Sequence, residues 1–135
     1  MKKPLADRLR LWLFFWLPVF IWSGSIFFVS SIPGKDLLDV GFPHADKIVH
    51  AGEYLVLGAL LARALRRSFE KAKLTSIVAL SIVLAAAFAA LDEWHQRFVP
   101  DRTCDPVDFA TDVAALSFGV FLYKKREEIA RDKAV

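Results

Sequence analysis

Acidic residues and a histidine recur at helical spacing in one segment of this chain. Asp46, His50, Glu53 and Tyr54 fall at i, i+4, i+7 and i+8, which places them on one face of a helix, and Lys47 adjoins the first of them. Carboxylates beside an imidazole can exchange protons or bind a cation. The segment therefore contains groups suited to acid–base chemistry or to ion binding.

A second segment carries acids in a comparable stripe. Asp105, Asp108 and Asp112 fall at i, i+3 and i+7, and Ala115 and Gly119 continue the same face at i+10 and i+14. Small residues let two helices approach closely. We therefore expect a close helix contact beyond the acids.

The two stripes can be compared by depth if both helices begin at the same level. Glu53 and Asp112 then each lie about 10 Å further along, at 1.5 Å per residue. His50 and Asp108 form a shallower tier, and the first acid of each stripe marks the mouth of the site.

A third polar group follows the long apolar run that ends near Leu91. Asp92 and Gln96 share a face at i, i+4, and Glu93 lies beside them. We predict that the three helices contribute to one outward-facing acidic vestibule. Arg102 is either an anion ligand, because a guanidinium can clamp a phosphate or carboxylate, or a structural partner of nearby acids.

So many acids cannot all be ionised within a membrane, because burial and like charge both disfavour the charged form. We predict that cations neutralise some acids and that at least one carboxyl is protonated. The cations available are Lys47, His50, Arg97 and Arg102. Glu53 or Asp92 is then the candidate general acid or base, with His50 tuning it. The predicted binding residues are Asp46, Lys47, Tyr54, Glu93, Gln96, Arg102, Asp108 and Asp112.

Several other chemistries lack their usual sequence patterns. The chain has no H-E-x-x-H, C-x-x-C or EF-hand spacing, so we predict no metal and no cofactor. It has no G-x-S-x-G elbow, and Ser30 and Ser31 lie in a different segment from the polar residues. The single cysteine, Cys104, has no partner for a disulfide within the chain.

Four apolar runs must position these groups. Residues 11–32 and 74–91 are uncharged and long enough to span a bilayer, whereas residues 48–65 and 107–123 carry the charged stripes and should face protein rather than lipid. The first run exceeds the length of a signal-peptide core and lacks a cleavage motif. We predict an all-α, polytopic membrane four-helix bundle that forms a single domain over residues 1–135, and we disfavour a soluble bundle.

Lys and Arg are concentrated in three segments: the N-terminus, residues 63–73 and the C-terminus. Because cytoplasmic loops are enriched in Lys and Arg, we predict that both termini are cytoplasmic in the inner membrane and that the acid-rich segments face outward. This topology accounts for the formal charge of +3 without a nucleic-acid partner.

The order of these motifs resembles the VanZ-like family of small bacterial membrane proteins. The resemblance extends over about residues 28–123 and rests on SSIP, PHADKIVHAGEYLVLG and LDEWHQRFVPDRTCDPVDFATDVAALSFG. The family usually has Gly at position 101, an aromatic at position 51, Gly at position 115, and Asn or Asp at position 112. This chain has Asp101, Ala51, Ala115 and Asp112 there, and the first three departures concern turn geometry and helix packing.

The namesake of that family is associated with resistance to glycopeptide antibiotics such as teicoplanin. The resemblance implies a protein that recognises or modifies a cell-envelope component or an amphiphilic antibiotic, with the bilayer and a lipid-linked or envelope substrate as partners. Two alternatives stay open: a non-catalytic membrane assembly factor, and an oligomeric proton-coupled transporter in which Glu53 and Asp112 carry protons. The residues do not indicate whether the protein is an enzyme or an oligomer.

Overall fold

The computed structural model describes residues 4–34 and 45–133, with side chains of the second stretch described from Lys47 onward. All regular structure in these ranges is helical, which confirms the predicted all-α class. The elements are α1 (Leu5–Leu11), η1 (Trp12–Trp16), α2 (Leu17–Ser30), α3 (Ala45–Ser68), α4 (Leu74–Gln96) and α5 (Pro106–Asp132).

The first three elements follow one another without a break and act as one long helix. The wider, π-helical turn η1 ends at Trp16, two residues before Pro18, which has no N–H to donate to the preceding turn. Trp16 Nε1 donates to Ser68 Oγ at 2.9 Å, and the guanidinium of Arg63 lies 4.5 Å from the centre of the Phe15 ring. These contacts join this helix to the last turns of α3.

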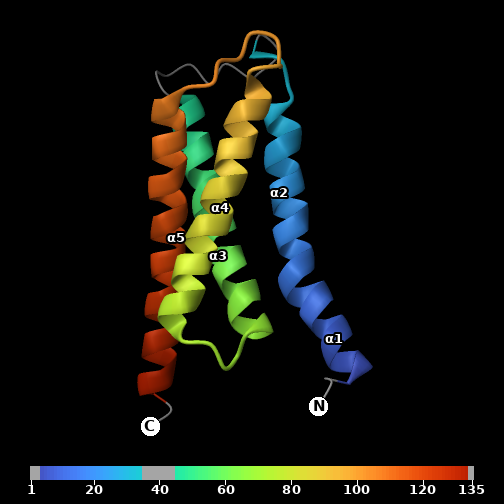
Figure 1. The fold of residues 1–135 in the computed structure, drawn as a ribbon, viewed down its shortest axis with the longest axis vertical. Helices are drawn as coiled ribbons and strands as arrows, with labels where there is room; N and C mark the ends of the chain where they lie inside the picture. The colour runs from blue at the N-terminus through green and yellow to red at the C-terminus, as the bar shows by residue number, and fades with distance from the viewer. Residues whose placement is uncertain (1–3, 35–44, 134–135) are drawn as a thin grey trace.

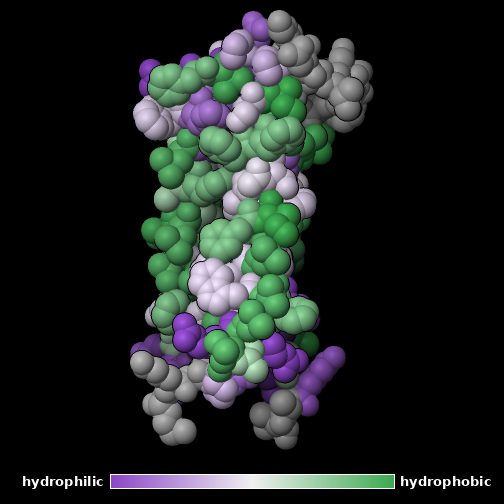
Figure 2. Space-filling model, turned by 90° about the vertical axis from the view of Figure 1, so that its right-hand side faces the viewer, coloured by the Kyte–Doolittle hydropathy of each residue, from purple (hydrophilic) through white to green (hydrophobic). Residues whose placement is uncertain are grey.

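Four helices are long and apolar enough to cross a membrane: Leu5–Ser30, Lys47–Ser68, Leu74–Gln96 and Pro106–Asp132. Each helix extends past at least one end of the apolar run predicted as a span, because polar residues continue the helix there. The first helix ends at Ser30, two residues before the predicted end of its run. Figure 2 shows a hydrophobic band along the middle of the molecule and hydrophilic residues toward its ends. Large apolar side chains such as Phe20, Phe28 and Val83 are exposed, as expected for a surface that faces lipid.

The helices run alternately up and down, so α1 begins and α5 ends at the same end of the molecule (Figure 1). α3, α4 and α5 pack against one another, and α2 lies against α3 and α4. The core between them contains the fully buried Tyr54, Leu57, Leu116 and Ala89. The C-terminal ends of α2 and α4 and the N-terminal ends of α3 and α5 meet at the end opposite the termini.

The closest helix contact joins α3 and α5 through two reciprocal glycines. A Cβ at Gly119 would lie 2.0 Å from the carbonyl oxygen of Leu55, and a Cβ at Gly58 would lie 2.2 Å from that of Leu116. The two backbones are therefore in direct contact, as in other small-residue membrane interfaces. This confirms the contact predicted beyond the acids of the second stripe.

The segment that connects α4 to α5 is bonded to the end of α2. Arg102 donates from Nε to the Ile32 carbonyl and from Nη2 to the Val29 carbonyl, both at 3.3 Å. The preceding residue, Asp101, has a φ of 57°. Glycine adopts this left-handed conformation most easily, which gives a physical reason for the Gly that the resembling family usually has at this position.

Candidate functional site

Asp92 is the centre of a buried hydrogen-bond network. Its side chain comes from α4, is 1% exposed, and accepts three hydrogen bonds at Oδ2. The donors are Ser30 Oγ on α2 at 2.7 Å, Tyr54 OH on α3 at 3.1 Å and Gln96 Nε2 on α4 at 3.4 Å. The structure therefore brings three of the predicted site residues together, and it adds Ser30.

The sequence analysis did not predict Ser30 as a site residue, because the apolar run that contains it has no ionisable residue. Its position could have indicated this role. Ser30 lies near the end of the first apolar run, and in an up-and-down bundle that end lies at the same depth as the end of the third apolar run, beside Asp92. A hydroxyl buried at that depth needs a hydrogen-bond partner, and the carboxylate of Asp92 supplies one.

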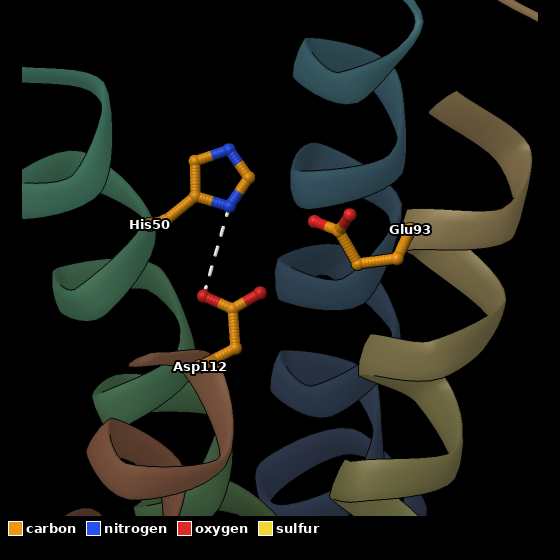
Figure 3. Close-up of side chains that lie close together, drawn as sticks. All are labelled: His50, Glu93 and Asp112. Carbon is orange, nitrogen blue, oxygen red and sulfur yellow. Dashed lines mark ion pairs between the residues drawn. The ribbon is translucent and has the colours of Figure 1, made fainter. Parts of the chain in front are cut away.

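A second cluster is formed by three side chains from three helices. Figure 3 shows His50 of α3, Glu93 of α4 and Asp112 of α5 pointing toward one another. One ligand atom from each lies within 4.8 Å of the others, and His50 Nδ1 is 3.7 Å from Asp112 Oδ1. Asp112 is 0% exposed and Glu93 is 3% exposed. We call these three residues the His50–Glu93–Asp112 cluster.

Several buried polar atoms of this region have no hydrogen-bond partner among the described residues. They are His50 Nδ1, Asp92 Oδ1, Glu93 Oε1 and both carboxyl oxygens of Asp112. An unsatisfied buried polar group costs about 1–3 kcal/mol, and more when it is charged. A native structure rarely leaves five such atoms together, so the arrangement calls for an additional occupant.

Glu93 also fixes the start of α5. Its Oε2 accepts the backbone N–H of Asp105 at 3.0 Å, and Asp105 Oδ1 in turn accepts the N–H of Val107 at 2.8 Å as the helix cap. One carboxyl oxygen of Glu93 is thus committed to the fold. The other, Oε1, is buried without a hydrogen-bond partner among the described residues.

The depth comparison made from the sequence was wrong by close to one helical turn. His50 pairs with Asp112 rather than lying level with Asp108, and Lys47 Nζ forms its ion pair with Asp108. Lys47 Nζ also lies 3.7 Å from Asp105 Oδ2. The reason is that the glycine contact between α3 and α5 sets the register, and the two helices do not begin at the same level.

The remaining predicted residues lie at the edges of these groups. Glu53 is half-buried, and its backbone carbonyl accepts Trp22 Nε1 at 2.8 Å. Arg102 is bonded to the carbonyls at the end of α2, so its structural partner is α2 rather than a neighbouring acid. The side chain of Asp46 lies outside the described residues. Cys104 is exposed and unpaired in the segment before α5.

Two further residues near the site, His95 and Arg97, lie outside the two polar groups: one packs against α2 and the following residue, and the other is on the surface. His95 Nε2 lies 3.0 Å from Ser31 Oγ, and its ring stacks on Phe27 with the centroids 4.4 Å apart. Arg97 is exposed. Neither residue is therefore part of the two polar groups described above.

Two grooves lined by described residues lie away from the cluster. One lies between the first helix and α3, where Arg10, Phe14, Arg63 and Arg67 contribute to its lining. Another runs between α3 and α5 past Ala59. The prediction of a vestibule rests on the positions of the polar side chains.

Comparison with curated proteins gave no match, and comparison with solved structures gave none. The model of the VanZ/LLP1 family matches residues 6–130, which is nearly the whole chain. The four helices that can cross a bilayer agree with that assignment. The chain is a multi-pass, all-helical membrane protein, and it belongs to the VanZ/LLP1 family.

Proposed function

We propose that this protein recognises or modifies the polar part of a cell-envelope component or of an amphiphilic antibiotic, within an acidic vestibule that faces outward. The buried, unsatisfied atoms beside His50 and Asp112 are the observation that carries this proposal. An occupant that supplies positive charge or hydrogen-bond donors would satisfy them. The family's association with glycopeptide resistance supports an envelope-related role.

Charge distribution supports placing this vestibule on the outer side of the bacterial inner membrane. The last turn of α3 carries Arg66 and Arg67, the connection to α4 carries Lys71, and the C-terminal part of α5 carries Lys124 and Arg126. In Figure 1 these parts of the chain lie at the end of the molecule where the chain begins and ends. The positive-inside rule places that end in the cytoplasm. The polar clusters then lie near the outer face, where an envelope ligand can reach them.

The single cysteine offers a direct test of this orientation. Cys104 is exposed at the same end as the polar clusters. A membrane-impermeant maleimide should label it in intact cells. A matched variant, Cys104→Ser with Lys71→Cys, moves the thiol to the exposed turn between α3 and α4 and should react only after permeabilisation. The reverse pattern would overturn the proposed orientation.

Recognition fits the packing better than transport by one copy of the chain. The backbones of α3 and α5 touch at Gly58 and Gly119, two turns beyond His50 and Asp112. This contact leaves no path between these two helices for a substrate to follow. Alternating access would need a rearrangement of the closest contact in the molecule or a site shared between copies.

The function can be tested by expressing the protein in a susceptible bacterium and measuring the inhibitory concentration of teicoplanin together with the polar-lipid profile. Asp112→Asn is the informative variant, because it removes a charge without changing the shape of the side chain. Glu128→Gln is the control on the same helix, since Glu128 forms only an exposed ion pair with Lys124 at 3.6 Å. Arg102→Ala is avoided because it would release the end of α2.

We expect wild type and Glu128→Gln to change resistance or lipid composition equally. Asp112→Asn should match the empty vector at equal membrane abundance. If Asp112→Asn retains the full effect, the cluster is not the functional site. If wild type changes neither quantity, the proposed envelope role fails.

The hydrogen bonds of Asp92 indicate that this residue holds helices together, as the assembly-factor alternative expects of the whole polar region. Its carboxylate joins α2, α3 and α4, so Asp92→Asn should lower the melting temperature in detergent. Asp112 makes no such hydrogen bonds among the described residues. Asp112→Asn should therefore stay folded, and unfolding of this variant would favour the assembly reading for the whole polar region.

A further inference from the structure

The unsatisfied atoms of the His50–Glu93–Asp112 cluster converge on one point. One ligand atom from each of these three residues, which come from three different helices, lies within 4.8 Å of the others. His50 Nδ1, Glu93 Oε1 and both carboxyl oxygens of Asp112 have no hydrogen-bond partner among the described residues. Figure 3 shows both carboxylates and the imidazole turned toward the space between them. Both acids are more than nine-tenths buried, so bulk water does not solvate them.

A proton alone does not account for this arrangement. Protonation of His50 would pair it with Asp112, whose Oδ1 lies 3.7 Å from Nδ1. That pair would still leave the free oxygen of Glu93 without a partner among the described residues. A single ion between the three side chains contacts all of them at once.

We propose that His50, Glu93 and Asp112 bind a first-row divalent cation such as Zn²⁺ or Mn²⁺. Two carboxylates and a neutral imidazole carry a formal charge of −2, which balances such an ion. Imidazole and carboxylate together suit these metals, whereas Ca²⁺ and Mg²⁺ favour oxygen ligands alone. This inference rests on the proposed function only in placing the metal in the same site, the His50–Glu93–Asp112 cluster.

The distances are compatible with a site that closes slightly around its ion. Metal–ligand bonds of about 2.0–2.2 Å in a tetrahedral site place any two ligand atoms roughly 3.3–3.6 Å apart. The three atoms lie within 4.8 Å, so side-chain adjustments of under about 1 Å complete the coordination.

Surrounding contacts already orient two of the three ligands. The Asp105 N–H holds one oxygen of Glu93 at 3.0 Å and directs the other inward. The His50 ring stacks beside Tyr54 with the centroids 6.4 Å apart. Such outer contacts fix ligand orientation in metal sites. Three protein ligands leave at least one coordination position for water or for an oxygen of a bound ligand.

The test uses the full-length protein in detergent after metals have been removed with a chelator. Zn²⁺ affinity and stoichiometry are measured by competition with a chromophoric chelator, and Co²⁺ is added separately as a spectroscopic probe. We expect one tight site per chain and a Co²⁺ spectrum that indicates nitrogen and oxygen ligands without thiolate.

Glu93→Gln and Asp112→Asn should each weaken Zn²⁺ binding at least about 100-fold, since removal of a ligand exceeds the 10–100-fold cost of losing an outer contact. Both variants preserve side-chain shape, and the amide oxygen that Glu93→Gln introduces can still accept the Asp105 N–H. His95→Gln and Glu128→Gln are the controls, because they remove a histidine and an acid outside the cluster. Both controls should bind like wild type.

Absence of a tight site in the wild type, or equal loss in the His95→Gln control, overturns the inference. Unchanged affinity in either cluster variant also overturns it. If Asp112→Asn fails to fold, Glu93→Gln and the wild-type Co²⁺ spectrum decide. No envelope ligand is present in this assay, so a bound metal without any resistance or lipid phenotype would refute the proposed function but not the metal site.

Discussion

Adding one methyl group at the α3–α5 contact should destabilise the protein, although alanine favours helices more than glycine does. The Cβ of Gly119→Ala would lie 2.0 Å from the Leu55 carbonyl oxygen and 2.9 Å from its carbonyl carbon. Both atoms belong to the backbone and cannot rotate away. Reaching an ordinary contact of 3.4 Å requires the helices to separate locally by about 1.4 Å.

The expected size follows from two opposing terms. Replacing Gly by Ala inside a helix contributes about 0.5–1 kcal/mol of stability. Overpacking costs about 1–3 kcal/mol, and the upper end applies where backbone meets backbone. Gly119→Ala should therefore lower the free energy of unfolding by about 2–2.5 kcal/mol net. Gly58→Ala should behave alike, since its Cβ would meet the Leu116 carbonyl at 2.2 Å.

Two other helical glycines provide the control. Nothing lies within 4 Å of a Cβ at Gly52 on α3 or at Gly24 on α2. Their alanine variants should be neutral or more stable by up to about 1 kcal/mol. Unfolding by increasing SDS in mixed micelles, followed by circular dichroism, gives all four values. If Gly119→Ala proves as stable as Gly52→Ala, the two helices do not touch as described.

Three further outcomes follow from individual contacts. Ser30→Ala should lower the free energy of unfolding by about 1.5–3 kcal/mol, because it removes a 2.7 Å hydrogen bond to a buried carboxylate. Ser25→Ala should change that free energy little, since its hydrogen bond is local and exposed. Unfolding in SDS compares the two variants. Asp101→Val should lower the free energy of unfolding by about 1–2 kcal/mol, because a β-branched residue is strained at a φ of 57°, whereas Asp101→Gly should not lower it. Equal melting temperatures for the two variants would show that the left-handed backbone at this position does not matter for stability. Arg102→Ala should lower the melting temperature by releasing the end of α2, and retention by Arg102→Lys of the full wild-type stability would contradict a role for the forked guanidinium.

The sequence predicted the four-helix architecture because two runs without charge and two with one polar face leave few alternatives in a membrane. It also predicted that α5 makes a close helix contact beyond its acids, since Gly119 continues the acidic stripe, but it did not identify α3 as the partner. It did not predict the register, because the contact at Gly58 and Gly119 fixes it and the level at which each helix begins cannot be read from composition.

The sequence predicted most residues of the polar site but few of the contacts between them. Stripes at i, i+4 spacing identified His50 and Asp112, because one helix face is a local property. The sequence predicted that three helices share one polar site, but not that Glu93 is the residue of α4 that joins His50 and Asp112, because no sequence spacing records contacts between helices. The bond from Ser30 to Asp92 was missed for the same reason: the two residues are 62 positions apart.

The shared position of the two chain ends has a practical consequence. α1 begins and α5 ends at the end of the molecule opposite the polar clusters (Figure 1). A fluorescent protein, an affinity tag or a second copy of the chain can be fused to either end without covering those clusters. Tethered tandem copies can therefore carry a cluster variant in one half alone, and their response would show whether each copy works independently.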